Sequence, residues 1–135
     1  MSELVCELIV SVDGFAKGQR SPGYFGYFGP DFDNWIKTNS ATPHRMIIGR
    51  KTYEMMNGFP TQFRDEGWEK MVATPGWLLS KTLKTSDWKG LKVVSDDLVD
   101  FVHELKRTDG SELRTLGSMS LVRQLLVAGL VDRLK

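Results

Sequence analysis

Three short segments at the ends of predicted strands combine hydroxyl side chains with glycine, with basic residues or with both. They are Gly49-Arg50-Lys51-Thr52, Ser80-Lys81-Thr82 and Thr115-Leu116-Gly117-Ser118-Met119-Ser120. A turn from a strand into a helix leaves the first helical N–H groups unpaired, and glycine lets a ligand approach the backbone closely. Such turns bind anions, so the three segments together predict a ligand that carries phosphate groups.

Each segment also has a simpler structural interpretation. Ser118 caps the following helix and Gly117 only makes the turn, since a lone Gly-Ser pair is a weak signal. Arg50 and Lys51 are a solvated pair of basic residues, salt-bridged to Glu54. Two cations at a helix N-terminus oppose the helix dipole, however, which favours an anionic ligand there. The Ser-Lys-Thr segment is ordinary alone, but the end of a parallel strand suits a ribose 2′-phosphate.

The elements that would position these segments alternate along the chain. Apolar and β-branched runs predict strands at 4–12, 45–48, 77–80, 91–94 and 112–116, with a further short strand within 130–135. Helical spacing and capping residues predict helices over 31–38, 50–56, 97–107 and 119–128, and we expect residues 59–75 to form a loop. Asp31 or Asp33 is expected to cap the first helix. The alternation indicates an α/β sandwich around a mostly parallel sheet.

Composition narrows the class of protein. The chain of 135 residues suits a single domain, 1–135, and its eighteen basic and seventeen acidic residues give a net charge of +1. That balance argues against nucleic-acid binding. One cysteine, Cys6, excludes an internal disulfide, and His44 and His103 lack metal-ligand spacing, so we expect no metal site. An acidic N-terminus and the lack of an apolar run of ~20 residues predict a cytoplasmic protein without a membrane span.

Taken in order, the motifs resemble those of the dihydrofolate-reductase-like family, in the branch of the riboflavin-biosynthesis reductase domain. The matching pieces are Ser11-Val-Asp-Gly-Phe15, Gly49-Arg-Lys-Thr-Tyr-Glu54, Pro75-Gly-Trp-Leu-Leu-Ser-Lys-Thr-Leu83, Leu116-Gly-Ser-Met-Ser-Leu121 and Ala128-Gly-Leu-Val-Asp132. The resemblance covers nearly the whole chain. It implies a three-layer α/β sandwich of the dihydrofolate-reductase type, with a mixed, mostly parallel sheet and NADPH lying across the strand ends.

The resemblance also implies roles for single residues. The Gly-Arg-Lys-Thr and Ser-Lys-Thr segments would hold the adenosine end and 2′-phosphate of NADPH, and the Gly-Ser turn would hold its pyrophosphate. The implied cofactor set is Gly49, Arg50, Lys51, Thr52, Ser80, Lys81, Thr82, Gly117, Ser118, Met119, Ser120 and Leu121. The chain departs from the family pattern in two respects. Ser118 stands where dihydrofolate reductases have the second glycine of a pair joined by a cis peptide bond. The strands that close the sheet after the Gly-Leu-Val-Asp motif in family members are expected to be absent.

Three carboxyls are candidates for the proton donor that a hydride transfer needs. They are Asp13 in the first turn and Asp31 and Asp33 beside Trp35, and a buried carboxyl there would be able to hold a proton. Turn formation by Asp13 and helix capping by the other two explain the same residues equally well.

The aromatic residues between glycines in 21–30 suit a loop that covers a planar substrate, and equally a loop packed on the core or on a second copy of the chain. The leading hypothesis is an NADPH-dependent reductase of a small pterin-like or ribosylamino-pyrimidine substrate, acting as a homodimer. The alternatives are an NADP-binding protein without turnover and a module whose aromatic loop mediates dimerisation.

Overall fold

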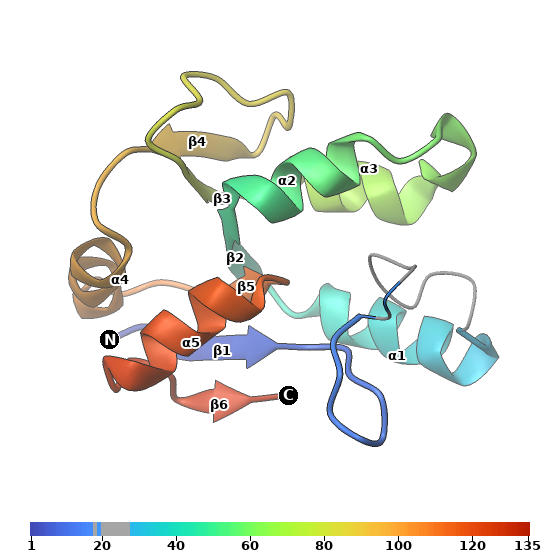
Figure 1. The fold of residues 1–135 in the computed structure, drawn as a ribbon, viewed down its shortest axis with the longest axis horizontal. Coiled ribbons are helices and arrows are strands. Elements are labelled where there is room, and N and C mark those ends of the chain that lie inside the picture. Colours follow the sequence, from blue (N-terminus) through green and yellow to red (C-terminus); the bar gives the residue numbers. More distant parts are fainter. Residues whose placement is uncertain (18, 20–27) are drawn as a thin grey trace.

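The computed structural model describes residues 1–17, 19 and 28–135, and its centre is one six-stranded sheet (Figure 1). The strands are β1 (Leu4–Glu7), β2 (His44–Gly49), β3 (Gly76–Leu79), β4 (Leu91–Val94), β5 (Glu112–Leu116) and β6 (Arg133–Leu134). Their order across the sheet is β4-β3-β2-β5-β1-β6, and every pairing among the described residues is parallel. The predicted α/β sandwich is confirmed. The antiparallel part of the expected mixed sheet is not found in the described chain.

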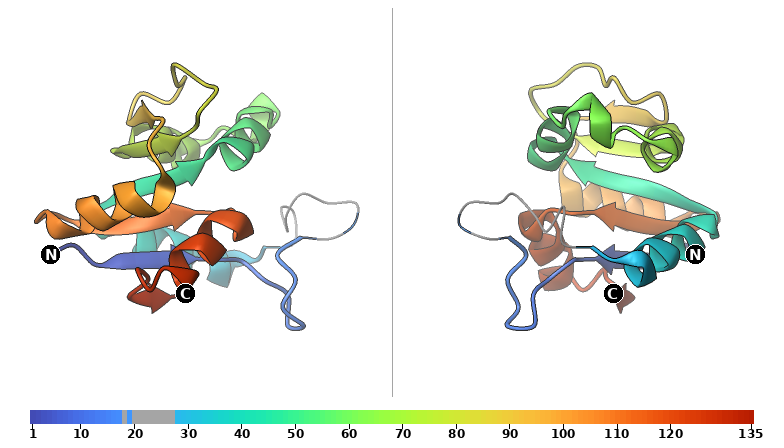
Figure 2. Two further views of the ribbon diagram at one scale, coloured as in Figure 1. Left: turned by 60° about the vertical axis from the view of Figure 1, so that its left-hand side comes forward. Right: turned by 90° about the vertical axis from the view of Figure 1, so that its right-hand side faces the viewer.

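Helices cover both faces of this sheet (Figures 1 and 2). They are α1 (Pro30–Ala41), α2 (Arg50–Asn57), α3 (Glu66–Ala73), α4 (Leu98–Arg107) and α5 (Met119–Val127), with the 3-10 turn η1 (Thr61–Phe63). One buried cluster joins β1, β2 and β5 to α4 and α5, and the other joins β2, β3 and β4 to α2 and α3. Side chains alternate between the two faces of each strand, which is why adjacent residues such as Ile47 and Ile48 serve different clusters.

Residues 59–75 were expected to form a loop, and that expectation is wrong. They contain η1 and α3, and the side chain of Asp65 caps α3 by accepting a hydrogen bond from Trp68 N at 3.1 Å. Trp68 is buried and packs edge-to-face on Trp88, with ring centroids 5.6 Å apart. The helix was missed because it is only eight residues long, so its apolar positions barely repeat.

Two local predictions near the N-terminus also need correction. The first strand ends at Glu7 rather than at Val12, and the apolar residues Ile9, Val10 and Val12 beyond it lie exposed. Neither Asp31 nor Asp33 caps α1. Gly29 occupies the N-cap position and Pro30 the first helical turn, so the two carboxylates lie inside the first turn. They complement the positive end of the helix dipole from there.

Candidate functional site

The three predicted phosphate-binding segments lie along one edge of the sheet. Because all strands are parallel, their carboxyl ends share an edge, and β3, β2 and β5 are consecutive neighbours in the sheet. Gly49 ends β2 and leads into α2, Ser80 follows β3, and Gly117 follows β5. The topology therefore places together what the sequence separates, and in parallel sheets ligands bind at this edge.

The segments after β2 and β5 also touch each other. A Cβ atom added at Gly117 would lie 3.1 Å from Thr52 Cγ2, and one added at Gly49 would lie 3.7 Å from Leu121 Cδ1. Thr52 is in the first turn of α2 and Leu121 in the first turn of α5, so the two helix N-termini converge. Glycine at 117 makes this approach possible, because any larger residue would meet Thr52.

The turn into α5 leaves amide groups ahead of the helix. Gly117 and Ser118 have φ angles of 62° and 64°, in the left-handed region, and the peptide between them is trans. Ser118 Oγ accepts a hydrogen bond from Leu121 N at 3.3 Å, so the capping interpretation of Ser118 is confirmed. The first intrahelical bond runs from Val122 N to Ser118 O. The N–H groups of Met119 and Ser120 therefore precede the helical bonding pattern and suit an anion.

The basic residues at this edge are exposed. Arg50 binds Glu54 at 2.9 Å, as its simpler interpretation predicted, but the two side chains are 39% and 47% exposed. An ion pair in that setting contributes little stability and exchanges easily for a stronger anion. Lys51 and Lys81 are exposed, and neither belongs to an ion pair within the described residues. The edge thus carries positive charge that is free to meet a ligand.

Ser80 has a structural task that the sequence did not show. Its side chain is buried, and its hydroxyl oxygen accepts hydrogen bonds from Thr82 N at 3.2 Å and Leu83 N at 3.0 Å. Ser80 N donates to Val94 O, which continues the pairing of β3 with β4 for one residue. Ser80 therefore shapes the turn, and Lys81 and Thr82 are the residues that it presents to solvent.

The three candidate proton donors are all exposed. Asp13 lies in a tight turn, where its carboxylate accepts a hydrogen bond from the Ser11 hydroxyl and Gly14 has a φ of 89°. Asp31 and Asp33 lie in the first turn of α1. None of them occupies the buried environment that we expected of a proton donor, and the turn interpretation of Asp13 is confirmed.

Aromatic side chains gather at the start of α1. Phe28 stacks on Phe32 with ring centroids 4.2 Å apart, and Phe32 lies 5.9 Å from Trp35. Residues 20–27, which hold most of the aromatic segment, lie outside the described residues, so its role as a loop that covers the substrate stays a prediction.

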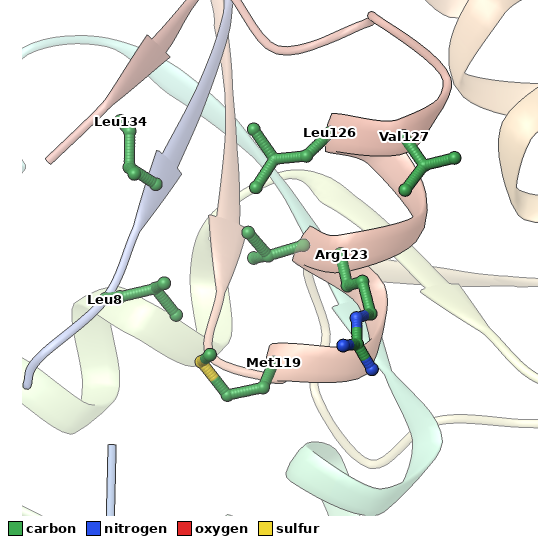
Figure 3. A pocket seen from close by; sticks show the side chains of 7 residues that line it. Leu8, Met119, Arg123, Leu126, Val127 and Leu134 are labelled. Atoms are coloured by element: carbon green, nitrogen blue, oxygen red, sulfur yellow. The ribbon is translucent and has the colours of Figure 1, made fainter. Parts of the chain in front are cut away.

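A residue that the sequence reasoning missed is Arg123. It lines a hollow of about 410 Å³ with Met119 and Ser120, beside the start of α5. A second, apolar hollow of about 430 Å³ continues along α5 toward β1 and β6 (Figure 3). It is lined by Leu8, Met119, Val122, Arg123, Leu126, Val127 and Leu134. The helical spacing of Ser120 and Arg123 was a signal that placed both on one side of α5.

Within the described residues, no group of three or more His, Cys, Asp or Glu side chains is arranged to hold a metal ion. The helices of the described chain are too short or too polar to cross a bilayer.

Comparison with known proteins agrees with the fold. The chain is 23% identical over 142 residues to Uncharacterized protein YyaP of Bacillus subtilis, covering 98% of this chain and 71% of that protein. A crystal structure of a "Putative riboflavin biosynthesis protein" from Shewanella sp. PV-4 superposes with a TM-score of 0.64 at 18% identity, covering 98% of this chain and 73% of that one. A pyrimidine reductase-like protein from Corynebacterium diphtheriae gives 0.61 at 19% identity, covering 98% and 72%.

The two solved structures establish likeness of fold, since their identities to this chain are low. The family assignment comes from sequence, because residues 2–135 match the family model of the RibD C-terminal domain. That match spans all three edge segments together with β1 and β6. The resemblance drawn from the motifs is confirmed, and the chain belongs to the RibD C-terminal domain family.

Proposed function

We propose that this chain is an NADPH-dependent reductase that transfers a hydride to a small heterocycle of the pterin or ribosylamino-pyrimidine class. The observation that carries the proposal is the convergence of the segments after β2, β3 and β5 on one sheet edge. Membership of a family with reductase-like structural neighbours supports the same reaction class.

The residues at the edge fit the charged parts of such a cofactor. The N–H groups of Met119 and Ser120 would hold the pyrophosphate, and the absence of a side chain at Gly117 leaves room for it against Thr52. Lys81 would hold the 2′-phosphate, with Arg50 turning from Glu54 toward the ligand. NADPH would supply the hydride, and Asp13, Asp31 and Asp33 are the carboxyls to test as source of the accompanying proton.

Binding of NADPH is tested by fluorescence titration, with NADH as comparator. We expect NADPH to bind more tightly than NADH and the Lys81→Ala variant to lose that preference, because one charge-assisted contact to a phosphate is worth ~2 kcal/mol. Lys92→Ala, an exposed lysine on β4, is the matched control and should bind as the unsubstituted chain does. Equal binding of both cofactors by the unsubstituted protein would refute the 2′-phosphate site.

A second candidate function is NADP binding without turnover. The exposure of Asp13, Asp31 and Asp33 favours it, since none of the three lies in a buried setting beside the proposed cofactor edge. The two functions separate when dihydrofolate or a ribosylamino-pyrimidine is added to the protein with NADPH. Substrate-dependent loss of the reduced nicotinamide absorbance identifies the reductase, and binding without oxidation over a range of such substrates identifies the binding protein.

A further inference from the structure

The loop from Ser80 to Gly90 joins β3 to β4 (Figure 1). Hydrogen bonds near its far end attach it to α2. Trp88 of this loop is only 2% exposed. Its ring meets Tyr53 of α2 edge-to-face at 5.3 Å and Trp68 of α3 at 5.6 Å. A loop that buries a tryptophan between two helices has a fixed position, since pulling it away would expose that side chain to water.

Asn57, the last residue of α2, holds this loop by both ends of its amide. Its Oδ1 accepts a hydrogen bond from Trp88 Nε1 at 3.2 Å, and its Nδ2 donates to Asp87 Oδ2 at 3.0 Å. Tyr53, one turn earlier, accepts a third hydrogen bond at its hydroxyl from Asp87 N at 2.8 Å. Two consecutive loop residues are therefore clamped by one face of α2.

The two elements joined by this clamp are those that carry the predicted adenosine-end contacts. The helix α2 begins with Arg50-Lys51-Thr52, and the loop begins with Ser80-Lys81-Thr82. Their near ends are set by the pairing of Gly49 with Leu79 across β2 and β3. Their far ends are set by Asn57. With both ends fixed, the backbone that carries Lys81 has a defined position relative to the N-terminus of α2.

We infer that Asn57 is a positioning residue for the 2′-phosphate of the dinucleotide, acting through Lys81. This inference rests on the proposed function. It differs from a purely structural role in a measurable way: a structural role lowers stability and weakens all ligands alike. The positioning role weakens the ligand with the 2′-phosphate and spares the one without it, because NADH makes no contact that depends on Lys81.

The hydrogen bond between Asn57 and Asp87 allows a rescue test by exchange of donor and acceptor. Asn57→Asp keeps the acceptor for Trp88 Nε1 but places a second carboxylate against Asp87, where the amide donated at 3.0 Å. Asp87→Asn alone leaves an acceptor for the Asn57 amide. The double variant Asn57→Asp with Asp87→Asn restores one donor and one acceptor in exchanged positions. Gln62→Glu, an exposed amide in η1, makes the same chemical change outside the clamp.

The dissociation constants of NADPH and NADH are measured for all four variants by fluorescence titration, with melting temperatures recorded beside them. If the fraction of loops in the competent position falls to about a tenth, the NADPH constant of Asn57→Asp rises about tenfold. The NADH constant stays within about twofold, and Asp87→Asn, the double variant and Gln62→Glu bind NADPH as the unsubstituted chain does. In a Lys81→Ala background, Asn57→Asp should have no further effect on NADPH, since the effect travels through Lys81.

The outcomes separate this inference from the proposed function. If the unsubstituted protein binds neither dinucleotide, the proposed function is refuted and the positioning role with it. If that protein prefers NADPH and Asn57→Asp keeps the same preference, or loses affinity for NADH equally, the positioning role alone is refuted. A double variant that stays as weak as Asn57→Asp would refute the exchange of hydrogen bonds on which the argument depends.

Discussion

Substitution of Gly117 by alanine tests the edge where α2 and α5 meet. Two separate costs follow from the structure. The φ of 62° at Gly117 lies in the left-handed region, where an L-residue costs ~1 kcal/mol or slightly more. In addition, the new methyl group would lie 3.1 Å from Thr52 Cγ2, which is tighter than ordinary van der Waals contact. A modest overpacking of this kind costs ~1 kcal/mol, so the expected total is ~2 kcal/mol of unfolding free energy.

Gly129→Ala is the matched control for the backbone part of this cost. Gly129 follows α5 with a φ of 69°, and a Cβ added there meets nothing within 4 Å. The Gly129→Ala variant should therefore lose ~1 kcal/mol of unfolding free energy from the left-handed conformation alone, and its affinity for NADPH should not change. Thr52→Ser isolates the other part, since it removes the methyl group that Gly117→Ala would strike and keeps the hydroxyl. In that background, Gly117→Ala should cost as little as Gly129→Ala.

The assay is urea unfolding of each variant, followed by titration of the folded proteins with NADPH. Gly117→Ala should weaken NADPH binding, because the methyl group occupies the space in which the pyrophosphate would approach the Met119 and Ser120 amides. The reasoning is wrong if Gly117→Ala proves no less stable than Gly129→Ala and binds NADPH as tightly as the unsubstituted chain. Loss of stability with full NADPH affinity would leave the packing argument intact and refute the pyrophosphate site.

Two further predictions concern ion pairs. Glu54→Gln removes the partner of Arg50 and should tighten NADPH binding up to about threefold, which titration measures. The unfolding free energy, measured with urea, should change by less than ~0.5 kcal/mol because the pair is exposed. Weaker NADPH binding would contradict a contact between Arg50 and the cofactor. Burial raises the pKa of Asp132, but hydrogen bonds from Leu4 N and Lys106 outweigh it and hold that pKa below the ordinary 3.8. The Asp132 carboxylate therefore stabilises the fold above pH 3.8, and this contribution is lost as the pH falls through the lowered pKa. In a plot of unfolding midpoint against pH, Asp132→Asn should flatten the acid limb. An unchanged slope of that limb would contradict the prediction.

Sequence reasoning succeeded where the local pattern and the packing agree. The strands β4 and β5 have the predicted bounds. The helix predicted over 97–107 is α4, which begins one residue later because Asp97 caps it by accepting a hydrogen bond from Asp100 N. The shared sheet edge also followed from sequence, because alternation of strands and helices forces the strand ends together.

What could not be predicted depends on partners that are distant in the chain. The buried Arg114 pairs with Glu112 on its own strand and donates to the main-chain carbonyl of Asn39 on α1. A charged residue inside a strand gives no sign of such a partner 75 positions away. The clamp by Asn57 was hidden for the same reason. In the sequence Asn57 is an ordinary residue at the end of a helix, and its partners Asp87 and Trp88 lie about 30 positions away.

The position of β1 has a consequence for how the chain reaches its native state. The first strand pairs with β5, so that Leu4 lies opposite Leu113, and with β6, where Val5 lies opposite Arg133. β1 therefore stays unpaired until β5, more than 100 residues later in the chain, has been synthesised. Contacts of such long sequence separation slow folding, because the connecting chain loses conformational entropy before the strand pairing that compensates for this loss has formed. Until then Leu4, Val5 and Cys6 present an unsatisfied apolar strand, which makes the nascent chain a candidate substrate for holding chaperones.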